Sequence, residues 1–269
     1  MTEVLSQRTD VLESIGGWVR GRLTVLLDLS TLFYLALKEL IAERDKGFSL
    51  IFEITLRQIY FTGVEALKVV TLVSLTLGTI VIVESGSQME FLGGVHFIVS
   101  ILVLVIIREL GPLLTAFIVI GRSGTAIAAE LGNMIVAHEL EAIQAMGINP
   151  IYFIVAPRII GVTIAVTCLA IYFSTVALIG GFLVSKLLLP ISLPVFLREL
   201  VASLTAADLV FGILKSSIFG LLIALTCTYH GLRARYSPIE VPQVATRGVV
   251  SAILFCFMSN ALLTLLFYL

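Results

Sequence analysis

The sequence predicts an all-α integral membrane protein. Of its residues, 59% are hydrophobic and only 13% are charged, whereas soluble domains carry about 25% charged residues. Apolar stretches near the length of about 20 residues that a transmembrane helix needs recur along the chain. Lysine and arginine gather in alternate connections between them. These observations predict an N-terminal interfacial helix, five transmembrane helices, and a short cytoplasmic helix between the second and third spans.

The N-terminal region is expected to lie outside the membrane core. Residues 1–22 are polar, whereas residues 23–41 are apolar but contain Asp28, Lys38 and Glu39. Apolar side chains in 23–41 recur at helical spacing on one side, which is typical of a helix lying in the membrane interface. A sixth span is the alternative. We expect one membrane domain, 1–269, with a cytoplasmic or interfacial region at 1–58 and a five-span core at 59–269.

Five apolar stretches are long enough to cross a bilayer. The second is longer than a span requires, so it tilts or extends beyond the membrane. A loop carrying its own short helix is expected over 122–150. The spans are predicted at about 59–83, 92–121, 159–185, 209–232 and 248–268.

The distribution of basic residues predicts the orientation. With the N-terminus inside, twelve lysines and arginines outside the spans lie on the cytoplasmic side, and two, Lys186 and Arg198, lie on the outer side. Cytoplasmic loops carry such an excess. The C-terminus is therefore expected outside, and a sixth span would break the bias. The inner residues are Arg8, Arg20, Arg22, Lys38, Arg44, Lys46, Arg57, Arg122, Arg158, Arg233, Arg235 and Arg247.

Two adjacent charges, Arg108 and Glu109, interrupt the second span. On a helix, neighbouring side chains point about 100° apart, so each charge needs its own partner. A charge at the bilayer centre costs about 2.5–3.5 kcal/mol on insertion scales. The pair lines a substrate cavity or subunit interface, or it is structural and pairs with groups such as Lys215. Pro112, which follows Gly111, is expected to kink this helix.

The helix predicted over 138–146 combines apolar and acidic residues. Gly147 suits its C-terminal cap, and Pro150 prevents its continuation. This helix either docks into a partner or rests on the membrane or on the protein's own loops. Its carboxylates fit an anionic inner leaflet poorly, which favours a protein partner. The residues concerned are Leu140, Ile143 and Met146 on one side, with Glu139 and Glu141 nearby.

Several kinds of chemistry are excluded. His138-Glu139 lacks the second histidine of the zinc-protease motif H-E-x-x-H, and no G-x-x-x-x-G-K-[ST] motif for ATP occurs. The three cysteines are far apart and lack metal-ligand spacing. A net charge of -1 provides no basic surplus for nucleic acid. We therefore predict no catalytic residue, metal or cofactor on this chain, and any ATP hydrolysis requires a separate polypeptide.

A long ordered block of motifs occupies the centre of the chain. It comprises Arg108-Glu109-Leu110-Gly111-Pro112-Leu113-Leu114-Thr115-Ala116, Gly121-Arg122-Ser123-Gly124, Ala128-Ala129-Glu130-Leu131-Gly132, Glu139-Leu140-Glu141-Ala142-Ile143 and Met146-Gly147-Ile148-Asn149-Pro150, ending at Pro157-Arg158. With flanking segments at 57–64 and 245–250, this block resembles the MlaE (YrbE-type) permease family over residues 50–268. Two positions depart from the family pattern: Ile239-Glu240-Val241-Pro242-Gln243 replaces a glycine-rich stretch, and Asn260 replaces an aspartate.

The resemblance implies a homodimeric permease of an ABC-type phospholipid transporter in the bacterial inner membrane. Its expected partners are a cytoplasmic ABC ATPase, which binds the ATP, and an MCE-domain substrate-binding protein on the outer side. The transporter would move phospholipid between the inner and outer membranes. The expected lipid contacts are Leu77, Val81, Arg108, Glu109 and Leu110. The expected ATPase-coupling residues are Glu139, Leu140, Glu141, Ile143 and Met146.

A second hypothesis is a stand-alone proton- or ion-coupled transporter. An intramembrane carboxylate such as Glu109 suits a proton site. Against this hypothesis, the sequence contains no evident internal repeat of the kind that many secondary transporters carry.

Overall fold

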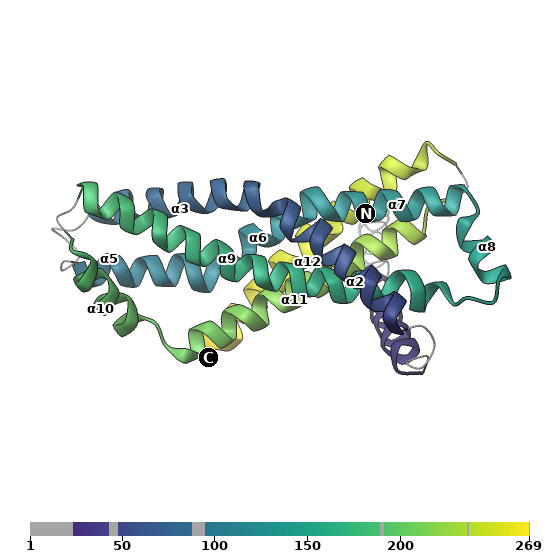
Figure 1. Cartoon of the computed structure of the whole chain (residues 1–269), viewed down its shortest axis with the longest axis horizontal. Coiled ribbons are helices and arrows are strands. Elements are labelled where there is room, and N and C mark those ends of the chain that lie inside the picture. The colour runs from purple at the N-terminus through teal and green to yellow at the C-terminus, as the bar shows by residue number, and fades with distance from the viewer. Residues whose placement is uncertain (1–23, 43–47, 88–94, 189–190, 236, 269) are drawn as a thin grey trace, which may run out of the picture.

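The computed structural model describes residues 24–42, 48–87, 95–188, 191–235 and 237–268. These residues form an elongated bundle of helices, with no strand among them (Figure 1). Five helical segments are long and apolar enough to cross a membrane, which confirms the predicted number of spans. They are Ser49–Gly86, Ile98–Val136, Ile151–Leu187, Ala206–Leu232 and Glu240–Phe267.

The first span is formed by two helices, α2 (Phe48–Thr62) and α3 (Leu67–Ser87), joined by a 3₁₀ turn at Val64–Ala66. The span was predicted to begin at residue 59, and the helical segment that contains it begins earlier, at Ser49. Glu53 and Arg57 belong to the region 1–58 that was predicted to be cytoplasmic or interfacial. In the structure they form an ion pair of 2.8 Å one turn apart on the exposed side of the helix. The predicted boundary between 58 and 59 therefore falls inside a helix.

The second span is one unbroken helical path with two π-helical segments. The prediction of a loop beginning at residue 122 is wrong, because the helix continues to Val136. Ile127 and Leu131 are buried in the core, and this part of the chain packs against the fourth and fifth spans. Tertiary packing thus accompanies a helix that continues through Gly121 and Gly124. The segments are α5 (Val95–Leu102), η2 (Val103–Leu110), α6 (Gly111–Val119), η3 (Ile120–Gly124) and α7 (Thr125–Val136).

A short helix, α8 (Glu139–Ala145), lies between the second and third spans. Gly147 adopts the left-handed conformation expected of a helix-ending glycine, with φ of 77°. Its N–H donates to the carbonyl of Gln144 at 2.9 Å. A helix therefore forms where the sequence predicts one and ends as expected. The third span follows as η4 (Ile151–Val155) and α9 (Ala156–Leu188).

The last third of the chain contains α10 (Leu193–Ser203), α11 (Ala206–Leu232) and α12 (Glu240–Tyr268). The sequence did not predict α10. α12 begins well before residue 248, where the fifth span was predicted to start. Pro242 does not prevent this, because a proline in the first turn removes no helical hydrogen bond. The segment 239–247 is therefore mostly helical.

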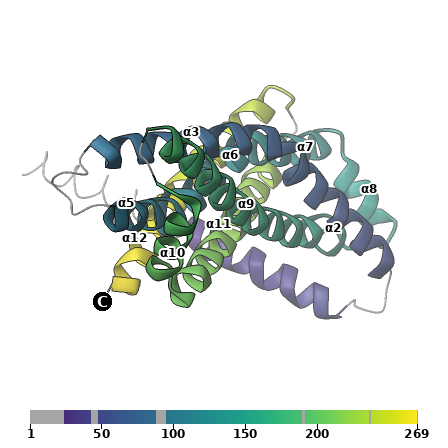
Figure 2. The ribbon, with the colours of Figure 1, turned by 60° about the vertical axis from the view of Figure 1, so that its left-hand side comes forward.

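A separate helix covers residues 24–42 and lies along the outside of the bundle (Figure 2). Leu29 and Ala36 are buried against the core, whereas Leu27 and Tyr34 are 65% and 62% exposed. Asp28 accepts a hydrogen bond of 2.7 Å from the Tyr229 hydroxyl of α11. The helix is not among the five span candidates. Its position in the membrane interface remains a prediction.

Close helix contacts in the bundle depend on small residues. α9 packs against α2, α3 and α11. A Cβ atom added to Gly78 of α3 would lie 2.0 Å from the carbonyl oxygen of Ala177 in α9. Small residues at such crossings let the backbones of membrane helices approach closely.

The two ends of the bundle carry different connections. α8 lies at one end, and α5 and α10 meet at the other (Figure 1).

With five spans, we expect a cysteine added at the C-terminus to react with a membrane-impermeant label from the outer side only. Gln144→Cys in α8 should react only from the cytoplasm. Both variants require a background without Cys168, Cys227 and Cys256, and C-terminal labelling only from the cytoplasm would contradict the orientation.

Candidate functional site

Arg108 and Glu109 lie in the last turn of the π-helical segment η2, and they face different partners. The Arg108 guanidinium pairs with Asp208 at the start of α11: Nε lies 2.8 Å from Oδ1, and Nη2 donates to Oδ2 at 3.0 Å. Asp208 is 1% exposed and also accepts from the backbone N–H and hydroxyl of Thr205, which caps α11. The expectation that each charge needs its own partner is met.

Glu109 lies in a polar cluster between the second, fourth and fifth spans. Its carboxylate accepts a hydrogen bond of 2.8 Å from Lys215, one of 3.1 Å from Thr264 and one of 3.3 Å from Asn260. The cluster thus joins η2 to α11 and α12. The pairing with Lys215 is the one named in the structural alternative.

Lys215 has a completely buried side chain, while that of Glu109 is 26% exposed. Besides Glu109, the ammonium donates to the Arg108 carbonyl at 3.1 Å and to the Thr264 hydroxyl at 3.0 Å. These three partners use all three of its N–H donors. A charge in the membrane interior is tolerated only when it is satisfied in this way.

The five predicted lipid contacts do not converge within one chain. Leu77 and Val81 are partly buried on α3, which packs mainly on α9. Arg108 and Glu109 instead contact α11 and α12. Leu110, also in η2, is partly buried. The lipid-binding role of these residues remains a prediction.

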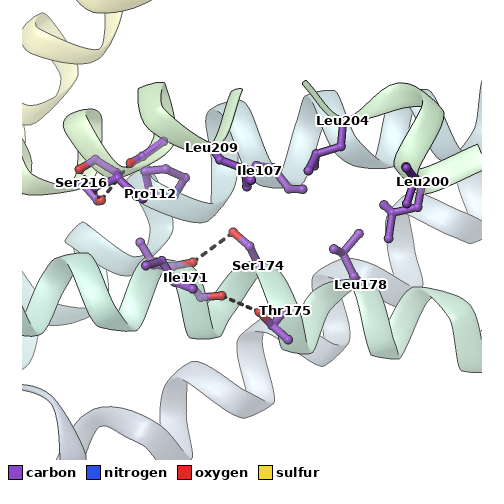
Figure 3. A pocket seen from close by; sticks show the side chains of 14 residues that line it. Ile107, Pro112, Ile171, Ser174, Thr175, Leu178, Leu200, Leu204, Leu209 and Ser216 are labelled. Carbon is purple, nitrogen blue, oxygen red and sulfur yellow. Dashed lines mark hydrogen bonds between the residues drawn. The ribbon is translucent and has the colours of Figure 1, made fainter. Parts of the chain in front are cut away.

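An apolar pocket of about 420 Å³ opens between the second, third and fourth spans and α10 (Figure 3). Its hydroxyl groups are turned to their own helices: Ser174 donates to Ala170 at 3.0 Å, and Ser216 donates to Gly212 at 2.8 Å. The pocket therefore presents a mostly hydrocarbon surface. Its lining is Ile107, Pro112, Ala170, Ile171, Ser174, Thr175, Leu178, Leu200, Val201, Leu204, Leu209, Gly212, Ile213 and Ser216.

The sequence analysis missed this pocket. Of its lining, only Pro112 had been singled out, as a kink beside the charged pair. The other residues are ordinary apolar or small residues of their spans, or belong to α10, which was not predicted. Only the packing of distant helices brings them together.

Two arginines of the central block tie the ends of the spans together. Arg122 forms an ion pair with Glu65 and donates to the Phe61 carbonyl at 2.6 Å, which links the second span to the first. Arg158 pairs with Glu130 at 2.7 Å and links the third span to the second. Motif spacing identified the arginines, but their partners became evident only in the folded chain.

α8 presents a mixed surface. Leu140 is 8% exposed and packs into the protein's own core, and Ile143 is partly buried against it. Met146 is 68% exposed, and the carboxylates of Glu139 and Glu141 are also on the outside. A partner could therefore reach these last three coupling candidates directly. The coupling role of all five residues remains a prediction.

The sequence of this chain matches a known family of membrane proteins. The family described as Permease MlaE matches residues 55–266. The chain belongs to the MlaE permease family. The match covers most of the first span, nearly all of the fifth, the three spans between them, α8, the Glu109 cluster and the apolar pocket. This MlaE-family protein is therefore a multi-pass membrane permease.

Relatives of this MlaE-family chain occur in bacteria and plants. A probable ABC transporter permease protein of Rickettsia prowazekii is 30% identical over 213 residues, covering 79% of this chain and 82% of the relative. One of Synechocystis is 29% identical over 214 residues, covering 80% and 81%. The chloroplast protein TRIGALACTOSYLDIACYLGLYCEROL 1 of Arabidopsis thaliana is 29% identical over 214 residues, covering 80% of this chain and 61% of the relative.

Proposed function

We propose that the chain is the permease subunit of an ATP-driven phospholipid transporter of the bacterial inner membrane. Two copies would form the membrane unit, with a separate cytoplasmic ABC ATPase and an MCE-domain protein on the outer side. The unit would move phospholipid between the inner and outer membranes. Relatives named as probable ABC transporter permeases support the ATP-driven class. The name of the Arabidopsis relative contains that of a lipid, trigalactosyldiacylglycerol, and this supports a lipid cargo.

The observation that carries the lipid assignment is the apolar pocket among the membrane spans. Sites for small molecules are mostly apolar and occupy about 300–1,000 Å³. The hydrocarbon lining suits an acyl chain and offers an ion almost no ligands. In the ion-coupled alternative, Glu109 would have to exchange protons, but its carboxylate is already engaged by Lys215, Thr264 and Asn260. The contacts of Glu109 therefore favour the lipid transporter.

A homodimer would use the exposed face of α12. Its apolar side chains Val250, Met258 and Leu262 are 50%, 69% and 58% exposed. Only 17% of the most apolar part of this span is buried within one chain. We assign this face to the second copy, which would bring the two Glu109 clusters to the sides of a shared cavity.

The proposal is tested by reconstituting the permease, its ATPase and its MCE-domain partner in vesicles containing fluorescent phospholipid. We expect ATP-dependent transfer of lipid, and no transfer when the ATPase is omitted or cannot hydrolyse ATP. Movement of an ion or solute driven by a pH gradient, without ATP, would instead support the stand-alone transporter. Lipid transfer that is indifferent to ATP would contradict the proposal.

A further inference from the structure

A second pocket, of about 460 Å³, lies where α11 ends and α12 begins. We call it the arginine pocket. Three guanidinium groups and one carboxylate line it, and it is separate from the apolar pocket and the Glu109 cluster. Its lining residues are His230, Arg233, Arg235, Glu240, Gln243, Val244 and Arg247.

Backbone geometry brings these residues together. After α11, the chain turns through hydrogen bonds from the N–H of Arg233 to the His230 carbonyl at 3.1 Å and from Ala234 to Gly231 at 3.2 Å. The Glu240 carboxylate accepts from the backbone N–H of Arg235 at 3.1 Å, which ties the start of α12 to this turn.

Close packing of α12 on α11 completes the pocket. A Cβ atom added to Gly248 would lie 3.5 Å from the Cβ of His230. The two helices are therefore in van der Waals range at this crossing, and Arg247, next to Gly248, lines the pocket beside the end of α11. The arginine pocket is thus a product of the helix crossing.

The positive charge of the arginine pocket is only partly balanced. Arg233 bonds to the Tyr229 hydroxyl and lies 4.0 Å from the Asp28 carboxylate. Within the described part of the chain, the guanidinium groups of Arg235 and Arg247 have no hydrogen bond or ion pair. The Nε2 atom of His230 is buried and has no hydrogen-bond partner among the same residues. Unused donors and excess positive charge together favour an anionic ligand.

We propose that the arginine pocket binds the phosphate group of an anionic phospholipid in the inner leaflet. Guanidinium groups match phosphate oxygens with paired, charge-assisted hydrogen bonds. The pocket lies at the ends of two membrane spans, at the level expected for head groups. Basic pockets between transmembrane helices on the cytoplasmic side bind such head groups. Ile239, which is 77% exposed and directly precedes Glu240 in the chain, offers an apolar contact for the lipid.

This inference goes beyond the proposed function, because it requires neither ATP nor transport. The test uses the purified full-length chain in detergent, titrated with phosphatidylglycerol or phosphatidylcholine and followed by native mass spectrometry. We expect the chain to prefer phosphatidylglycerol. Arg235→Gln combined with Arg247→Gln should weaken phosphatidylglycerol binding about tenfold or more. Neither side chain has a partner to lose among the residues that the structure describes, so we expect the thermal unfolding temperature not to change.

Arg57→Gln is the matched control, because it removes an exposed arginine that has its own carboxylate partner, Glu53. It should leave the lipid affinity unchanged. If the double variant is unstable, Arg235→Gln alone should still weaken binding measurably. A parallel titration with inorganic phosphate separates a lipid site from a general anion site.

Three results would overturn the proposal. The first is phosphatidylglycerol binding that is the same in the double variant and the wild type. The second is tight binding of inorganic phosphate without any preference for the lipid. The third is loss of ATPase association in the double variant while lipid binding is retained, which would make the arginine pocket a protein-docking site.

Discussion

Glu109→Ala is expected to destabilise the protein by about 3–5 kcal/mol, the range observed when one partner of a buried ion pair is removed. The substitution leaves the Lys215 ammonium completely buried and without its carboxylate. Thermal unfolding of the purified protein in detergent measures the loss. Combining Glu109→Ala with Lys215→Met should restore much of the stability, since no unpaired charge then remains. Glu109→Ala as stable as the wild type would show that the ion pair is not structural.

The same variants test whether Glu109 also contacts lipid. The carboxylate is partly exposed, so it can stabilise the helices and border a cavity at once. Phospholipid that co-purifies with the folded protein separates the two roles. Lower stability with unchanged lipid per folded protein would refute a lipid contact. Glu109→Lys should be the most harmful change, because it places a third positive charge beside Arg108 and Lys215.

Met146→Asp combined with Ile148→Asp is expected to abolish association with the ATPase while leaving the fold intact. These side chains, which directly follow the end of α8, are 68% and 40% exposed, and a helical segment docked in a groove depends on such apolar anchors. Loss of one central anchor commonly weakens an interface by about 2 kcal/mol or more. Co-purification of the ATPase with the permease provides the measurement. Full recovery of the ATPase with this double variant would contradict the docking role of α8.

Two controls distinguish docking from folding. Leu187, which is 83% exposed at the other end of the third span, can be changed to aspartate without an expected effect on ATPase association. Leu140→Asp should behave differently again, because Leu140 packs into the protein's own core. It should lower the unfolding temperature of the permease as well as ATPase association.

Local features of the sequence determined the class of the protein, the number of spans and the position of α8. A bilayer demands long apolar helices whatever their neighbours are, so hydropathy together with the distribution of basic residues predicted five spans. Gly147 and Pro150 ended α8 because the backbone preferences of glycine and proline are local. The ordered motifs from Arg108 to Arg158 indicated the family, which the match over 55–266 confirms.

Contacts between distant residues were decided only by the tertiary structure. Hydropathy could not show that Arg108 pairs with Asp208, or that Lys215 and Thr264 complete the Glu109 cluster, because these partners lie on other helices. The sequence also could not separate Leu140, which is buried, from Met146, which is exposed. Both are apolar residues on one short helix, and only the packing of that helix against the rest of the chain decides which of them remains available to a partner.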